Sequence, residues 1–292
     1  MSNLSYFGKD FNLIEEQISQ NKNWKYYHIK VPDSFTHISW LGEIEKIKNH
    51  SLDKIETIAL ECKNVINFKE LSKLKNLKNL RIINSEKLKN NNFKEFAKLK
   101  NIQELYIYES KLDNLKEIST CKQLKSLRLI NTEITEFNEI GKLENLNNLQ
   151  IFTRVDFNLD FLIKLKNLKS ISITGNKISD ISIFNQFKHK EFDLIELSLT
   201  NSTKYSKINW GVDARELNLE YFEGEKPNFH LLNEITSLIN SWRSYHLKIT
   251  CIVNQEFIDD LFLVDFRGHE IIINYLNNDF RFFDNLSIPK EF

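Results

Sequence analysis

The sequence predicts an α/β solenoid, in which short coils stack and each coil adds one strand to a parallel sheet. In the stretch LKSLRLINTEITEFNEIGKLENL, residues 124–146, successive apolar residues are separated by 3, 2, 5, 3, 3, 3 and 3 positions. An amphipathic helix alternates gaps of 3 and 4, and a half-buried strand repeats a gap of 2, so neither structure alone fits. The same pattern recurs along the chain, which indicates a repeat architecture.

The repeat is about 22 residues long. Its copies begin at seven apolar positions: Ile55, Leu77, Ile102, Leu124, Leu146, Leu168 and Leu194. A weaker copy follows near Ala214. The motif KLKNL occurs at 73–77 and again at 164–168, and the related motifs KLKNI and KLENL occur at 98–102 and 142–146. These recurrences fix the phase of the repeat.

Each unit reads as a strand followed by a helical arc. Leu127 and Leu129 are two positions apart, as in a strand with one buried face. Phe137, Ile140 and Leu143 follow at intervals of three, which suits a 3₁₀ helix. A single coil cannot bury its apolar side, so neighbouring coils must stack. We therefore predict that alternate strand residues are buried in one core (Leu127, Leu129, Leu149, Ile151, Ile171 and Ile173) and that the residues between them are exposed (Arg128, Gln150 and Ser172).

The units resemble leucine-rich repeats of the 22-residue kind, similar to those of bacterial internalins and of phosphatase-regulatory repeat proteins. The resemblance covers about residues 50–222. It implies a right-handed coil with a concave parallel sheet and a bacterial protein that recognises another protein. The family norm is an asparagine at the ninth position of each unit, and here Asn176 matches it. Four residues could replace it in part (Ser85, Ser110, Thr132 and Ser202). Lys63 and Arg154 could not, which predicts irregular loops after those two strands.

Three regions follow from this pattern. Residues 1–50 form an N-terminal cap, with a short helix in FNLIEEQI and a strand that carries Trp24, Tyr27 and Ile29. Residues 51–222 form about seven or eight leucine-rich repeat coils. Residues 228–292 form a small α+β module or an elaborate C-terminal cap, with a helix at 230–242, strands in LKITCIV and LFLVDFRGHEIIINYL, and a hairpin turn at Arg267–Gly268.

Composition points to a protein of a reducing cytoplasm. Forty basic residues balance forty acidic ones, so bulk charge indicates no particular partner. The three cysteines, Cys62, Cys121 and Cys251, are far apart and contain no CxxC pair, so we expect three free thiols. The first residues lack the pattern of a secretory signal, and there is no run of 18 apolar residues. We expect a cytoplasmic monomer without membrane contact.

The sequence contains none of the common catalytic or nucleotide-binding motifs, and its seven histidines are scattered. We therefore predict no enzymatic activity, no catalytic or metal-binding residues and no cofactor. One flank is basic, with lysines that precede successive strands: Lys73, Lys75, Lys98, Lys100, Lys122 and Lys125. Such a ridge could face nucleic acid, but a solvated flank is the better explanation in a chain of zero net charge. Nucleic acid is not the expected partner.

Function in this architecture normally lies on the exposed strand positions. The middle exposed column runs Ala59, Arg81, Tyr106, Arg128, Gln150, Ser172, Ser198 and Asn218, and the next column runs Glu61, Ile83, Tyr108, Ile130, Phe152, Thr174, Thr200 and Glu220. Four consecutive coils of the second column are apolar or aromatic, beside arginines and a tyrosine, which is a composition typical of interaction hot spots. We name this predicted protein-binding surface the concave patch: Arg81, Ile83, Tyr106, Tyr108, Arg128, Ile130, Gln150 and Phe152.

The sequence thus predicts a scaffold that binds another protein through its concave face. Two alternatives stay open at this point. One is an immunity protein that neutralises a toxin enzyme with the same surface. The other, of a different class, is an effector whose C-terminal module, residues 228–292, is an enzyme without a recognisable motif.

Overall fold

The computed structural model describes the chain except for residues 1–7, 21–24, 47–49, 89, 113, 133, 135, 155–156, 175–177, 179, 188–189, 200–211, 222–245, 252–269 and 276–292. The chain divides into two compact units. The first contains residues 1–153 and 164–167, and the second contains residues 154–163 and 168–292.

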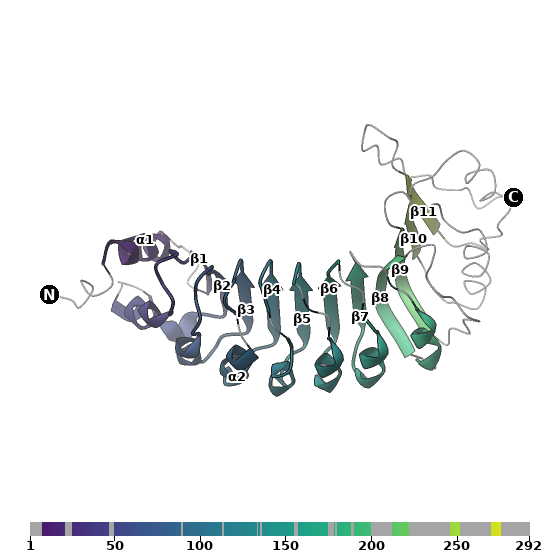
Figure 1. The fold of residues 1–292 in the computed structure, drawn as a ribbon, viewed down its shortest axis with the longest axis horizontal. Coiled ribbons are helices and arrows are strands. Elements are labelled where there is room, and N and C mark those ends of the chain that lie inside the picture. Colours follow the sequence, from purple (N-terminus) through teal and green to yellow (C-terminus); the bar gives the residue numbers. More distant parts are fainter. Residues whose placement is uncertain are drawn as a thin grey trace, which may run out of the picture. The chain divides into compact units, whose positions relative to one another are not determined.

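The first unit is built on parallel strands that pair in chain order. These are β1 (Tyr26–Lys30), β2 (Thr57–Glu61), β3 (Asn79–Ile83), β4 (Glu104–Tyr108), β5 (Ser126–Ile130) and β6 (Asn148–Phe152). Figure 1 shows these strands side by side, with the helices of the coils in a separate row. Leu105 pairs with Leu127, and Leu127 pairs with Leu149, so equivalent repeat positions lie side by side. The predicted repeat register is confirmed across these strands.

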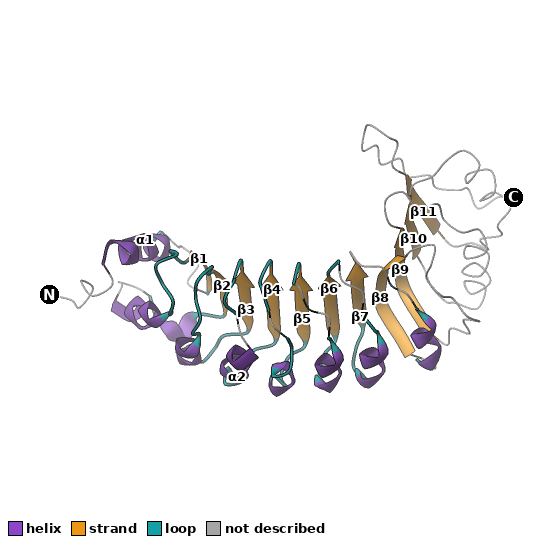
Figure 2. Cartoon of the chain, viewed as in Figure 1, coloured by secondary structure: helices purple, strands orange, loops and turns teal. Residues whose placement is uncertain are grey.

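Short helices close the coils (Figure 2). An α-helix, α1 (Gly8–Ser19), lies in the predicted N-terminal cap, and 3₁₀ helices follow: η2 (Ser39–Lys46), η3 (Leu52–Lys54), η4 (Lys69–Lys73), η5 (Ile118–Thr120), η6 (Asn138–Lys142) and η7 (Asp160–Lys164). The apolar gap of three therefore marks 3₁₀ geometry, as expected. The coil from 77 to 101 is longer, at 25 residues, and its arc is the α-helix α2 (Asn90–Ala97). The additional residues allow a full α-helical turn to form.

The core lies between the strands and the arcs. All six strand residues that we predicted to be buried have no exposed surface: Leu127, Leu129, Leu149, Ile151, Ile171 and Ile173. Arg128 and Gln150 lie between them and keep partial exposure. Tyr27 and Ile29 of β1 are buried in the same alternating pattern, which confirms that the N-terminal region contains a strand of the repeat type.

A row of side-chain amides links successive coils of the first unit. The amides of Asn76, Asn101, Asn145 and Asn167 each donate to a backbone carbonyl of the preceding coil, at distances of 2.7–2.9 Å. These asparagines stand just before the first leucine of a unit, in the KLKNL motif. This row satisfies backbone carbonyls at the turns between the coils.

The turn after each strand has two forms. After β3, β4 and β5 the eighth residue has a positive φ (Asn84, Glu109 and Asn131), and the ninth residue is buried (Ser85, Ser110 and Thr132). After β2 and β6 the eighth residue itself is buried (Cys62 and Thr153), and the ninth, Lys63 or Arg154, is exposed. The loops after those two strands therefore differ from the others, as predicted, because a long charged side chain cannot occupy the buried position.

The second unit continues with parallel strands in chain order. These are β7 (Ser170–Thr174), β8 (Lys190–Leu199), β9 (Val212–Tyr221), β10 (His246–Cys251) and β11 (Glu270–Tyr275), with the 3₁₀ helix η8 (Ser182–Gln186) between β7 and β8. The predicted strands in LKITCIV and EIIINYL are confirmed as β10 and β11, which each pair in parallel with the strand before them, and the predicted strand in LFLVDF lies outside the described residues. The predicted helix at 230–242, the turn at 267–268 and Asn176 lie outside the described residues.

The predicted register is wrong at one strand. We predicted that a unit begins at Leu194, but Ile171 pairs with Ile195 and Ile173 pairs with Leu197. The unit therefore begins at Phe192, which is buried, two residues earlier than predicted. Glu196, and not Ser198, follows Ser172 in the middle column.

Ser172 also departs from the prediction that it is exposed, since only 6% of its surface is accessible. Its hydroxyl donates to the carboxylate of Glu196, and the longer glutamate side chain covers it. Thr200, which we placed in the adjacent column, lies outside the described residues.

Candidate functional site

The structure brings the residues of the concave patch together on one face of β3, β4, β5 and β6. Arg81 pairs with Tyr106, Tyr106 with Arg128, and Arg128 with Gln150. Two residues further along each strand, a second row lies on the same face: Ile83, Tyr108, Ile130 and Phe152. The two rows lie on four neighbouring strands, which are about 4.8 Å apart. All eight residues therefore lie on one face of the sheet, in the strand order that the sequence predicted.

The centre of the patch is a stack of one tyrosine between two arginines. The guanidinium carbon of Arg81 lies 5.1 Å from the centroid of the Tyr106 ring, and that of Arg128 lies 4.7 Å from it. The arginines come from the strands on either side of β4, so they flank the ring from both sides. Each contact is within the range of a cation–π interaction.

Tyr106 is more enclosed than we predicted, because only 7% of its surface is exposed. Its hydroxyl donates to Oε2 of Glu104 at 2.6 Å, and its ring meets that of Tyr108 edge-on, at 6.3 Å between centroids. Burial raises the pKa of the Tyr106 phenol, and the nearby Glu104 carboxylate raises it further. Tyr106 is therefore a neutral, fixed support for the arginines, while Tyr108 and the arginines carry the exposed surface.

Both guanidinium groups lack acceptors within the described part of the chain. The Nε atoms of Arg81 and Arg128 are buried without a hydrogen-bond partner there. Ion pairs between described residues involve other cations, and on the same sheet face His28 pairs with Glu61 at 2.9 Å. Arg81 and Arg128 thus carry positive charges that no described carboxylate neutralises at contact distance.

The apolar row beside the stack is half-buried. Ile83, Tyr108, Ile130 and Phe152 each keep part of their surface accessible, because they stand at the ends of the strands, where neighbouring side chains cover them only in part. A continuous apolar row next to fixed cations is a combination found at protein interfaces.

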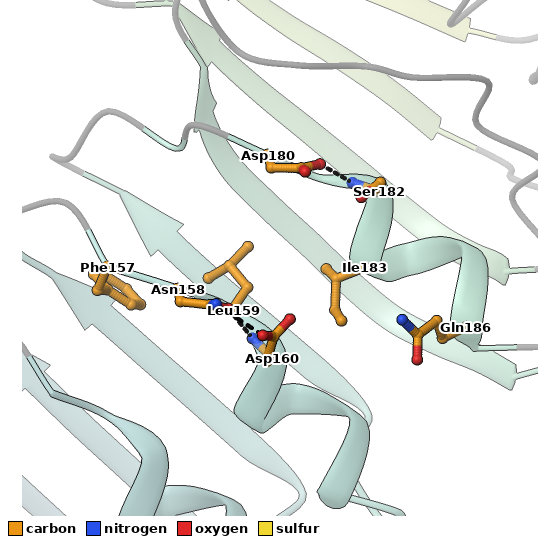
Figure 3. Close-up of a pocket in the computed structure, with 8 residues that line it drawn as sticks. All are labelled: Phe157, Asn158, Leu159, Asp160, Asp180, Ser182, Ile183 and Gln186. Atoms are coloured by element: carbon orange, nitrogen blue, oxygen red, sulfur yellow. Dashed lines mark hydrogen bonds between the residues drawn. The ribbon is translucent and has the colours of Figure 1, made fainter.

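A second candidate is a cavity of about 320 Å³ in the second unit, between the arcs that follow β6 and β7 (Figure 3). It is lined by Phe157, Asn158, Leu159, Asp160, Asp180, Ser182, Ile183 and Gln186. Asn158 accepts a hydrogen bond from the backbone N–H of Asp160 at 2.6 Å, and Asp180 accepts one from that of Ser182 at 2.7 Å.

The first unit contains the same kind of hydrogen bond before its own arcs. Asn67 accepts from the N–H of Lys69, and Asn114 accepts from that of Lys116, both at 2.9 Å. These side chains each accept from a backbone N–H two residues later and so stabilise the turns that lead into the arcs, as Asx turns do. The polar groups of the cavity are thus explained by the fold, and we assign no chemistry to them.

Three of the six lysines in the predicted ridge contact neighbouring groups of the chain. Lys73 pairs with Glu70, and Lys98 pairs with Glu95, each three residues earlier on the same arc. The ammonium of Lys122 donates to the carbonyl of Lys142 at 2.8 Å. These contacts favour the solvated-flank interpretation over a surface for nucleic acid.

Among the described residues, no group of three or more His, Cys, Asp or Glu side chains is arranged to hold a metal ion. No helix in the same part of the chain is both long enough and apolar enough to cross a membrane.

Comparisons with known proteins agree with the geometry. No protein-family model matches the chain, and no curated protein matches it in sequence. Among solved structures, an internalin (inlF) from Listeria monocytogenes is similar with a TM-score of 0.52 and 16% identity, over 78% of this chain and 63% of that protein. The internalin C2 (inlC2) of the same species gives 0.50 and 18% identity, over 71% of this chain and 91% of that one. The chain is a leucine-rich repeat solenoid.

The likeness establishes the fold of the solenoid and leaves its partner open. A leucine-rich repeat protein from Leptospira interrogans is also similar, with a TM-score of 0.42 and 20% identity. The solenoid spans less than two thirds of the inlF structure, at 63%.

Two features of the repeat solenoid escaped the sequence analysis. The amide row of Asn76, Asn101, Asn145 and Asn167 was visible in the sequence as the asparagine of the KLKNL motif. The Asx-turn residues were visible as well, since three of them are separated by multiples of 22: Asn114, Asn158 and Asp180, with Asn67 before them.

Proposed function

We propose that this leucine-rich repeat solenoid is a non-enzymatic scaffold that binds another protein through the concave patch. The observation that carries the proposal is the arginine–tyrosine–arginine stack beside the apolar row of Ile83, Tyr108, Ile130 and Phe152. Both lie on one face of four consecutive strands. Aromatic and arginine side chains supply most of the binding energy at many interfaces, because they bury large areas and offer directional donors.

The patch is also pre-organised. Tyr106 is held by its hydrogen bond to Glu104, and each arginine is held against the Tyr106 ring. Side chains that are ordered before binding lose less conformational entropy when a partner arrives. A fixed surface of this kind suits recognition of a folded protein, and it carries no group arranged as a nucleophile or a general base.

The similarity to two internalins supports a binding role only through their shared fold. Toxin neutralisation remains a special case of the same proposal, with a toxin enzyme as the partner. An enzymatic role would have to reside in residues 228–292, where the structure describes the two strands β10 and β11.

Site-specific photo-crosslinking tests the proposal. A photoreactive phenylalanine analogue replaces Tyr108 or Phe152 in the full chain, which is then irradiated in a lysate of the organism that encodes it. We expect one discrete crosslinked protein, the same from both positions. The control places the analogue at Ile66, which is 44% exposed in the loop after β2.

Crosslinking from Ile66 alone, or of unrelated proteins from Tyr108 and Phe152, would contradict the proposal. The same result would move attention to other surfaces of the solenoid.

A further inference from the structure

We infer that the concave patch takes an acidic protein surface, in which two carboxylates about 10 Å apart lie beside apolar side chains. This inference rests on the proposed function and specifies the chemistry of the partner. It starts from the two guanidinium groups, which are held against the Tyr106 ring and form no ion pair with a carboxylate among the described residues.

The spacing follows from the sheet. Arg81 is on β3 and Arg128 is on β5, with β4 and the Tyr106 ring between them. Strands that are two apart in a sheet are separated by about 10 Å. Because both guanidinium groups contact the same ring, neither can move toward the other, and the two positive charges keep this separation. A partner must therefore present its acceptors at a matching distance.

The donors that face a partner are the terminal Nη groups. Each Nε atom is buried, while each arginine as a whole is half-exposed. The planar end of a guanidinium donates two parallel hydrogen bonds to a carboxylate, which a lysine ammonium cannot do. Two such bidentate sites, fixed by one tyrosine, form a receptor for two separate carboxylates.

The surroundings favour a protein over a polyanion. Glu61 and Glu104 stand on the same sheet face, on β2 and β4. A nucleic acid carries closely spaced negative charge, so a strand laid along this face would meet these carboxylates as well as the arginines, whereas a protein surface can place its acidic groups at the arginines alone. The apolar row beside the arginines offers contact to apolar side chains: Ile83, Tyr108, Ile130 and Phe152. A protein surface can present apolar side chains together with isolated acidic ones.

The test uses a library of random twelve-residue peptides displayed on phage and selected against the full chain. We expect enriched peptides to contain at least two acidic residues together with aromatic or aliphatic ones. Their binding should fall at least ten-fold in Arg81→Gln and in Arg128→Gln, and it should weaken as salt is raised. Lys75→Gln, on the lysine flank, is the matched control for the loss of one positive charge and should bind normally.

Two further controls separate the role of the planar guanidinium group from loss of charge and from loss of folding. Arg81→Lys and Arg128→Lys keep the charge but lose the planar fork, so we expect intermediate affinity from both. Circular dichroism that matches the unsubstituted chain shows that each variant is folded.

The outcomes separate the inference from the proposed function. Peptides whose binding needs Tyr108 and Phe152 but not the arginines would overturn the acidic partner while leaving the concave patch in place. Peptides that depend on none of these four residues, or no enriched peptide at all, would overturn both. A twelve-nucleotide single-stranded DNA that binds through Arg81 and Arg128 as tightly as the peptides would also overturn the inference, since the site would then accept any polyanion.

Discussion

Truncation of Leu129 to alanine should destabilise the first unit by several kcal/mol. Leu129 lies in the middle of β5, has no exposed surface, and pairs with Ile107 on one side and Ile151 on the other. The change removes three carbon atoms, and at about 0.8 kcal/mol for each buried methylene the loss is about 2.4 kcal/mol. The neighbours cannot close the gap, because they are held in register by the sheet. The cavity term therefore brings the expected cost to about 3–5 kcal/mol.

Urea denaturation followed by tryptophan fluorescence and circular dichroism measures this cost. Hydrogen exchange locates it, and we expect reduced protection in β4, β5 and β6, since coils in a solenoid are stabilised by their nearest neighbours. Ile66→Ala is the matched control, because Ile66 is 44% exposed and should change stability by less than about 0.5 kcal/mol. A cost below about 1 kcal/mol for Leu129→Ala would refute the stacked-coil account of the core.

Three further predictions concern individual side chains. Glu109 has a φ of 45° at a turn where the neighbouring coils have asparagine, which tolerates this conformation better. Glu109→Asn should therefore raise the free energy of unfolding by about 0.5–1 kcal/mol in urea titrations. A loss of stability would contradict the turn geometry. Thiol titration should count three free cysteines in denaturant. In the folded chain Cys62 and Cys121 should react slowly, because burial raises the pKa of each thiol to about 12; a count of one in denaturant would reveal a disulfide. Burial lowers the pKa of Lys190 to about 8, so the folded state releases this proton before the unfolded state does, and stability should rise with pH between about 8 and 10. Lys190→Met should remove that rise, and an NMR titration in which Lys190 behaves like the other lysines would show the prediction to be wrong.

The fold could be predicted from the sequence because one periodicity dominates it. The gap of two between apolar residues marks the strand, and the repeated gaps of three mark the 3₁₀ arc. The structure has both elements. Every apolar residue that the interval placed in the core between Leu127 and Ile151 is buried.

The register failed at β8 for a physical reason. Phe192 replaces the usual leucine, and Leu194, Leu197 and Leu199 imitate the pattern two residues later. Since side chains alternate across a strand, a shift of two residues keeps the same residues facing the core. Hydrophobicity alone therefore cannot distinguish the two registers, and the hydrogen-bonded pairing decides between them.

The patch shows a similar limit. Alternation placed Arg81, Tyr106 and Arg128 in one column, but it could not reveal that the arginines enclose the tyrosine. That arrangement depends on the side chains of neighbouring coils, which are 22 to 25 residues away in sequence. The burial of Ser172 beneath Glu196 went unpredicted for the same reason.

The most direct test of the central claim measures the affinity of the solenoid for its partner after Tyr108 and Phe152 are both replaced by alanine. Both side chains are half-buried at the ends of their strands, so their loss should leave folding nearly intact. Isothermal titration calorimetry with the partner identified by crosslinking gives the affinity. Each substitution should cost at least about 1–2 kcal/mol, so the double variant should bind tens of times more weakly, or worse. Unchanged affinity, in a variant whose thermal unfolding matches that of the unsubstituted chain, would contradict recognition through the concave patch.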